Sequence, residues 1–170
     1  MAFTIRQALV RERFSLAATG DGGGNFFVGP GTNFPDKSFT FQTGTGTGQV
    51  NKAFVGTFAL TTSGTTSFDL TTAQWAGTTQ NMSTVREIQV ALSVGTTADT
   101  DPSVFIGPQS ISNGAVLCFG TTTGKADVRS WFSNQNPIVG WGVTSGNKVV
   151  QLTNNGSYPI TVNVMVLGTG

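Results

Sequence analysis

Apolar and polar residues alternate along much of this chain with the period of two that is typical of β-strands. Between residues 54 and 60 every second position is apolar or glycine: Phe54, Gly56, Phe58 and Leu60. The alternation resumes at Phe68 and Leu70, after the turn dipeptide Ser63-Gly64. These two segments are therefore predicted to be strands joined by a turn.

The clearest single strand is predicted in the segment VREIQVALSV, residues 85–94. One face carries four apolar residues, Ile88, Val90, Leu92 and Val94, and the other carries Glu87, Gln89 and Ser93. A strand with one apolar and one polar face is half-buried, as in antiparallel sheets that have one face on the core.

Three further apolar segments near the end of the chain are separated by turn residues. They are IVGWGV (138–143), KVVQLTN (148–154) and ITVNVMVLG (160–168). Their order predicts a terminal β-meander. Roughly nine or ten short strands with frequent turn signals predict an all-β fold, an antiparallel β-sandwich that is jelly-roll-like.

The first 35 residues differ from the rest and are predicted to be an N-terminal arm and linker, with the sandwich domain at 36–170. Residues 1–13 carry three arginines but too few apolar residues for a core, and TGDGGGN (19–25) has a linker composition. Such a segment can order on a partner by burying apolar side chains and pairing arginines with carboxylates. The predicted contact residues are Phe3, Ile5, Arg6, Arg11 and Arg13. The alternative is that residues 3–10 form the first strand of the sandwich.

Composition narrows the classes of partner. Charged residues are 10% of the 170, and 9 basic against 8 acidic residues leave a net charge of +1. This balance predicts neither nucleic-acid nor membrane binding.

The lone Cys118 excludes an intrachain disulfide, and arginines interrupt the apolar residues of the first 13 positions, so a secretory signal is not expected. We expect the chain to be made in a cytoplasm.

The residue types needed for catalysis are scarce. Histidine is absent, which excludes Ser-His-Asp and Cys-His sites within the chain. The glycines of FQTGTGTGQVNKAF (41–54) lack the spacing of a dinucleotide fingerprint and precede a strand, and FGTTTGKA (119–126) departs from a Walker loop at Phe119 and Ala126. Asp99 and Asp101 supply too few oxygens for calcium. We expect no enzyme activity, no metal and no cofactor.

The tryptophans are the remaining candidates for a binding role. Trp141 lies between apolar neighbours and is predicted to belong to the core, whereas Trp75, in TAQWAG, is the candidate surface aromatic. An exposed indole can stack on a sugar, but aromatic residues are also enriched at subunit contacts. The contact or core interpretation of Trp75 is preferred, and the sugar interpretation is kept as the alternative.

The order of motifs from roughly residue 40 to 170 resembles that of small all-β proteins of phages and prophages, the head decoration or head-fibre-like proteins. The segments that carry the resemblance are GTGTGQVNKAF, FALTTSGTTSFDL, VREIQVALSV, GWGVTSGNKVVQLTNNG and ITVNVMVLGTG. The chain departs from the family in its longer first 35 residues and in FSNQNPIVG.

The resemblance implies a structural protein of a bacteriophage virion. The expected role is a capsid decoration protein that binds the major capsid protein or another virion protein and stabilises the shell. The alternative is a binding module associated with a tail, vertex or fibre, with carbohydrate as one candidate ligand. A homotrimer is also expected, because closed symmetry covers sheet edges that otherwise invite aggregation.

Overall fold

The computed structural model describes residues 7–12, 16–19, 25–28, 37–75, 77–94, 102–107 and 126–170. Within these ranges the secondary structure consists of strands and turns, without a helix. Two antiparallel sheets pack face to face around a shared apolar core. The prediction of an all-β sandwich is therefore confirmed.

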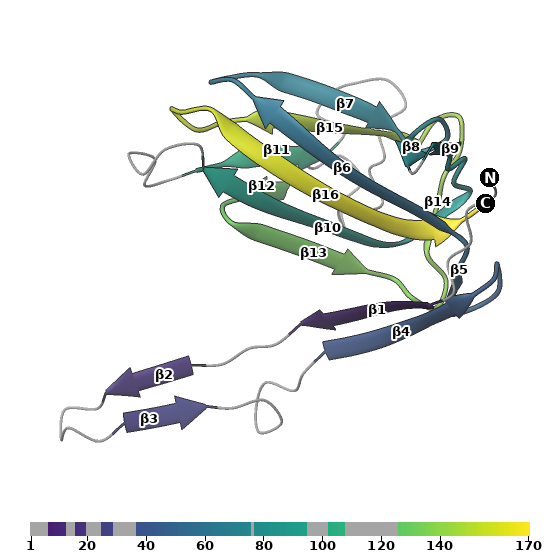
Figure 1. Ribbon diagram of the computed structural model, residues 1–170, viewed down its shortest axis with the longest axis horizontal. Coiled ribbons are helices and arrows are strands. Elements are labelled where there is room, and N and C mark those ends of the chain that lie inside the picture. Colours follow the sequence, from purple (N-terminus) through teal and green to yellow (C-terminus); the bar gives the residue numbers. More distant parts are fainter. Residues whose placement is uncertain are drawn as a thin grey trace.

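The two sheets of the sandwich are named after their longest inner strands (Figure 1). The β10 sheet has the order β13 (Trp131–Gln135), β10 (Thr84–Val94), β16 (Ile160–Thr169) and β6 (Lys52–Leu60), and β14 (Trp141–Gly142) also pairs with β10. The β15 sheet has the order β12 (Ala126–Val128), β11 (Val104–Gly107), β15 (Val149–Asn154) and β7 (Thr65–Asp69).

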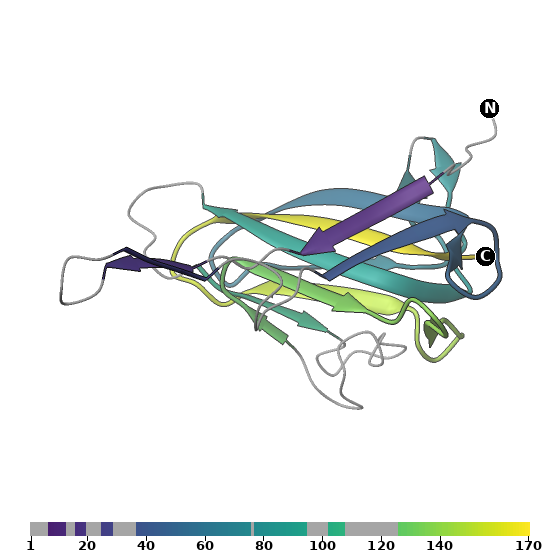
Figure 2. The ribbon, with the colours of Figure 1, turned by 90° about the horizontal axis from the view of Figure 1, so that it is seen from below.

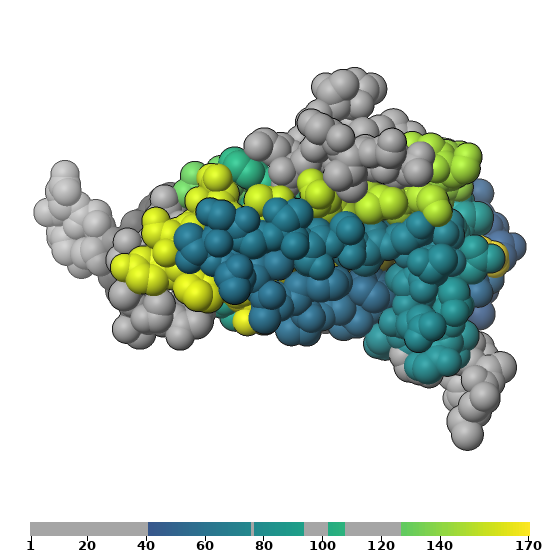
Figure 3. Space-filling view, turned by 90° about the horizontal axis from the view of Figure 1, so that it is seen from above, coloured from purple at the N-terminus to yellow at the C-terminus, as the bar shows by residue number. Residues whose placement is uncertain are grey.

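Strands of the sandwich pair in a nested order. The first strand, β6, pairs with the last, β16; β7 pairs with β15, β10 with β13, and β11 with β12. The two strands predicted within residues 54–70 are present as β6 and β7, but the turn at Ser63-Gly64 carries the chain from the β10 sheet to the β15 sheet. Figure 3 shows β6 and β7 as a continuous blue strip along this edge.

The predicted terminal β-meander is wrong. β14 and β16 belong to the β10 sheet, whereas β15, which lies between them in sequence, belongs to the β15 sheet. The physical reason is that each of these strands has one apolar face, and two apolar faces bury more surface by facing each other across a sandwich than by lying side by side in one sheet.

The main core lies between the two sheets and follows the predicted alternation. On β16 the inward residues are Ile160, Val162, Val164 and Val166, and on β10 they include Ile88 and Val90. The β15 sheet contributes Val104, Ile106, Val128, Val150 and Leu152. Phe54, Phe58 and Phe68 stack near the edge where β6 and β7 meet, with ring centroids 4.8 Å apart for Phe54 and Phe68.

A β-bulge interrupts the pairing of β10 with β16. Val85 lies opposite Gly168 and Glu87 lies opposite Leu167, so Arg86 is the extra residue. The bulge turns Val85 into the core while Glu87 stays on the outer face. Gly168 is needed here because a Cβ at this position would lie 2.1 Å from the carbonyl oxygen of Thr84.

The N-terminal strands form their own sheets outside the sandwich. β1 (Gln7–Glu12) pairs antiparallel with β4 (Lys37–Thr43), which pairs parallel with β5 (Gln49–Val50), and β2 (Leu16–Thr19) pairs with β3 (Asn25–Val28). Figure 2 shows β1 and β4 outside the two layers, with β2 and β3 beyond the end of the sandwich. A small pair, β8 (Gln74–Trp75) and β9 (Thr78–Thr79), lies next to β6.

Candidate functional site

The N-terminal contact residues predicted from the sequence lie only partly within the described ranges. Arg11 lies on β1, opposite Ser38 of β4. Phe3, Ile5, Arg6 and Arg13 lie outside the described residues. Residues 7–10 pair with β4 and with neither sheet of the sandwich, so the alternative that residues 3–10 are a first sandwich strand is wrong for its described part.

The segment predicted to be an arm and linker contains paired strands. Thr19 lies opposite Asn25, so the glycine-rich residues between them connect β2 to β3. The partner strand β4 begins at Lys37, and the first strand of the sandwich, β6, begins at Lys52. The arm therefore includes a strand that the sequence placed in the sandwich domain.

Phe41 joins this N-terminal sheet to the sandwich. It is fully buried, in a second cluster with Val50, Ala53 and Leu167 on the outer face of the β10 sheet. This cover explains why β16 is buried on both faces near its end, where Leu167 would otherwise face solvent. Phe41 thus fixes the end of β4 to the body through an apolar contact.

The glycine-rich turn after β4 is closed by its own side chains. The backbone N–H of Gly46 donates to Oε1 of Gln49 at 2.8 Å, and that of Gly44 donates to the carbonyl of Val50 at 3.1 Å. A Cβ at Gly44 would lie 2.2 Å from the same Gln49 oxygen. Because these N–H groups have partners within the turn, they do not form an anion cradle, in agreement with the sequence interpretation.

Arg86 links this turn to the loop at residues 136–140. Its buried guanidinium donates to the carbonyl of Ile138 at 2.5 Å and to that of Gly46 at 3.3 Å. Asn136 closes the loop by donating to the carbonyl of Gly140 at 3.1 Å and accepting from Val139 N–H at 3.4 Å. The loop is held in place while the side chains of Ile138 and Val139 are 56% and 72% exposed.

The three tryptophans occupy different environments. Trp75 is partly buried and packs against both apolar clusters at the edge of β6, which supports its interpretation as a packing residue. Trp141 is partly buried against the main core, as predicted. Trp131, which the sequence did not single out, is 50% exposed on β13. The sequence did carry a signal for this exposure. Trp131 and Phe132 are adjacent, so their side chains lie on opposite faces of the strand, and Phe132 packs against the core.

Trp131 stands on the outer face of the β10 sheet, in a row that crosses the sheet. Ala91 of β10 lies opposite Trp131, and Asn163 of β16 lies opposite Ala91. Thr57 of β6 follows, and its hydroxyl donates to Oδ1 of Asn163 at 2.9 Å. The row therefore combines one exposed indole with a small residue and two hydrogen-bonding side chains.

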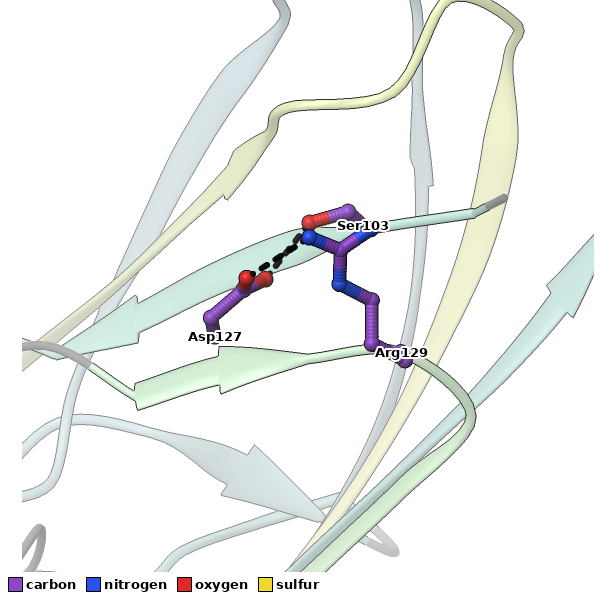
Figure 4. Close-up of polar contacts among 3 residues, drawn as sticks. All are labelled: Ser103, Asp127 and Arg129. Carbon is purple, nitrogen blue, oxygen red and sulfur yellow. Dashed lines mark hydrogen bonds and ion pairs between the residues drawn. The ribbon is translucent and has the colours of Figure 1, made fainter.

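A serine and a carboxylate meet at the start of β11 (Figure 4). Ser103 donates to Oδ1 of Asp127 at 2.6 Å, and Arg129 donates to Oδ2 at 3.0 Å. Ser103 is buried, and both carboxylate oxygens of Asp127 already have partners in the cluster. The cluster ties β11 to the β12 region and is not arranged for catalysis.

Asp69 and Lys148 form an ion pair between the ends of β7 and β15, with 2.6 Å between Oδ2 and Nζ. Burial by itself raises the pKa of Asp69, but hydrogen bonds from Lys148 and Thr71 outweigh burial and hold the pKa below its ordinary value. The carboxylate therefore stays ionised at neutral pH and stabilises the connection after β7.

The remaining residues that the sequence offered for chemistry lie outside the described ranges. Cys118, Asp99, Asp101 and the Walker-like segment up to Lys125 lie outside the described residues. Among the residues described, no three His, Cys, Asp or Glu side chains gather as metal ligands do, and no helix could span a membrane.

The sequence matches no known protein-family model and none of the curated proteins with which it was compared.

Proposed function

We propose that this protein is a structural protein of a bacteriophage virion, a capsid decoration protein that binds the major capsid protein and stabilises the shell. The observation that carries the proposal is the division of the chain into two parts. Strands β1 to β4 pair with one another outside the sandwich, and Phe41 fixes them to its outer face. The projecting strands would anchor the protein, and the sandwich would form the outward body.

The strand order supports a jelly roll, the two-sheet fold used by many viral capsid domains. Apart from the short β14, eight strands of the described sandwich pair first with last, second with seventh, third with sixth and fourth with fifth, and they form the orders β6-β16-β10-β13 and β7-β15-β11-β12. A jelly roll presents loops at both ends of a rigid body. Such a body suits a protein that adds contacts to a shell.

Self-association as a homotrimer is part of the proposal. The loop of residues 136–140 presents Ile138 and Val139 to solvent, although Arg86 and Asn136 hold its backbone rigidly. Two exposed aliphatic side chains on a fixed backbone lose little conformational entropy when a neighbour covers them. A closed assembly would cover them and would also protect the sheet edges at β13 and β12.

The first test is the number of copies in purified particles of the phage that encodes the protein, measured by quantitative mass spectrometry. Hundreds of copies per particle would support a shell protein. A dozen or fewer would place the protein at a tail or vertex instead, and its absence from particles would contradict the proposal.

The second test addresses anchoring. Purified protein is added to particles that lack it, and binding is compared with that of a triple variant, Arg6→Gln, Arg11→Gln and Arg13→Gln. We expect the triple variant to bind at least about tenfold more weakly, because arginine pairs with carboxylates contribute strongly at protein contacts. The control Arg129→Gln removes an exposed arginine from the sandwich and should bind normally. Equal binding by all three proteins would rule out anchoring through the arm arginines.

A further inference from the structure

The row across the outer face of the β10 sheet is the candidate surface, and we call Trp131, Ala91 and Asn163 the trough because the smallest of the three side chains lies between two larger ones. Trp131 stands on one side and Asn163 on the other, and Ala91 lies between them as the floor. Adjacent strands are about 4.8 Å apart, so the backbones of Trp131 and Asn163 are separated by about 10 Å. Because Ala91 has a single methyl group, a ligand on this face would contact the larger side chains of Trp131 and Asn163.

Asn163 is oriented by its neighbour. The hydroxyl of Thr57 on β6 donates to Oδ1 of Asn163 at 2.9 Å. Because Oδ1 is bound to Thr57, the amide is held in one orientation, and its Nδ2 group is the donor that it can offer to a ligand. A donor is thus held in place opposite the indole, without needing to be ordered when a ligand binds.

Further hydrogen-bonding groups flank the floor. Gln89 and Ser93 lie two positions before and after Ala91 on the same face of β10, about 7 Å away along the strand. Ser133 lies opposite Gln89 on β13. The Ser133 hydroxyl already donates to the buried Glu87 at 2.9 Å, so it can only accept a further hydrogen bond. The accessible side chains of the trough and its flanks are uncharged: Trp131, Ala91, Asn163, Thr57, Gln89, Ser93 and Ser133.

We propose that this trough binds a neutral saccharide. A pyranose ring has an apolar face of axial C–H groups, which packs on the electron-rich face of an indole, while its hydroxyl rim needs donors and acceptors such as amides and serine hydroxyls. The uncharged trough gives no reason to prefer an acidic sugar, because such a ligand would lose hydration of its carboxylate without gaining a cationic partner.

The proposal is independent of the place of the protein in a virion, because it concerns the isolated protein. Binding is measured on purified full-length protein, first against an array of neutral and acidic oligosaccharides built from glucose, galactose, mannose and N-acetylglucosamine. The best neutral tri- or tetrasaccharides are then titrated in solution while tryptophan fluorescence is recorded. We expect a dissociation constant in the micromolar to millimolar range and a change in emission, because Trp131 is the half-exposed tryptophan among three.

Variants locate the site. Trp131→Ala should weaken binding at least about tenfold and abolish the fluorescence change, Trp131→Phe should retain part of the affinity, and Asn163→Ala should weaken binding about fivefold. Tyr158→Ala is the matched control, because Tyr158 is also an exposed aromatic residue but lies outside the trough. Its affinity should be unchanged. Circular dichroism and thermal melting establish that each variant is folded.

Three outcomes would overturn the proposal. One is the absence of binding by neutral oligosaccharides at concentrations up to about 10 mM. Another is binding that survives in Trp131→Ala at full strength, which would move the site elsewhere. The third is a loss of self-association in folded Trp131→Ala without any saccharide binding by the original protein, which would make the trough a contact between copies of this chain.

Discussion

Replacing Phe41 with alanine should separate the N-terminal sheet from the sandwich. The side chain is fully buried against Val50, Ala53 and Leu167, so its removal leaves a cavity at the only apolar cluster that contains a residue of β4 among those described. Phenylalanine-to-alanine changes in cores cost about 3–5 kcal/mol. The conservative change Phe41→Leu keeps most of the volume and should cost about 1 kcal/mol.

The assay is equilibrium unfolding in urea, supported by thermal melting. For a chain of this size about 1 kcal/mol corresponds to about 2–4 °C, so Phe41→Ala should lower the melting temperature by about 10 °C. Leu167→Ala should cost about 3 kcal/mol, and the double variant should cost less than the sum because both changes empty the same cluster. A loss below about 1 kcal/mol for Phe41→Ala, or strict additivity with Leu167→Ala, would refute the contact between β4 and the sandwich.

Three further predictions concern the sandwich itself. Because the pKa of Asp69 is lowered, its contribution to the free energy of unfolding should be fully present above about pH 4 and should be lost as the pH falls through the lowered pKa. Asp69→Asn should therefore destabilise at pH 7, and urea titrations should show a smaller destabilisation as the pH falls below about 4. Gly140→Ala should cost about 1–3 kcal/mol in the same assay, because Gly140 has φ +78° and its Cβ would lie 2.8 Å from the carbonyl oxygen of Val85, whereas Gly146→Ala has open space and should be nearly neutral. Ile138→Ser with Val139→Ser should reduce self-association in sedimentation velocity without lowering stability, and an unchanged oligomeric state would remove this loop from the subunit contact.

Strand positions were predictable from the sequence because burial on one face imposes a period of two. The alternation at residues 85–94 predicted the inward positions of Ile88, Val90 and Leu92 on β10. The alternation at residues 160–168 predicted those of β16, which are Ile160, Val162, Val164 and Val166. Strand pairing was not predictable, since Phe58 and Phe68 show the same alternation whether their strands share a sheet or face each other. The turn at Ser63-Gly64 fits either arrangement, and only the packing of the whole core decides between them.

The candidate site was less predictable for a related reason. Trp75 and Trp131 both lie in polar surroundings in the sequence, yet Trp75 packs between two clusters and Trp131 stands on an open face. Their exposures depend on what lies on neighbouring strands, such as the small Ala91 beside Trp131. The bulge at Arg86 was not predictable either, because the extra residue is recognisable only when β10 is aligned with β16.

The nested strand order has a consequence for synthesis on the ribosome. β16 lies between β6 and β10 and joins residues as distant as Leu60 and Ile160, which are 100 positions apart in sequence. Until β16 has emerged, β6 lacks its sandwich partner and the apolar faces of β6 and β10 stay uncovered at the middle of their sheet. Folding of the body is thus expected to begin late and to be slow, since long-range pairings carry a large loop-closure cost. A nascent chain of this kind depends on chaperones, or on its own low content of long apolar runs, to stay soluble until the last strand arrives.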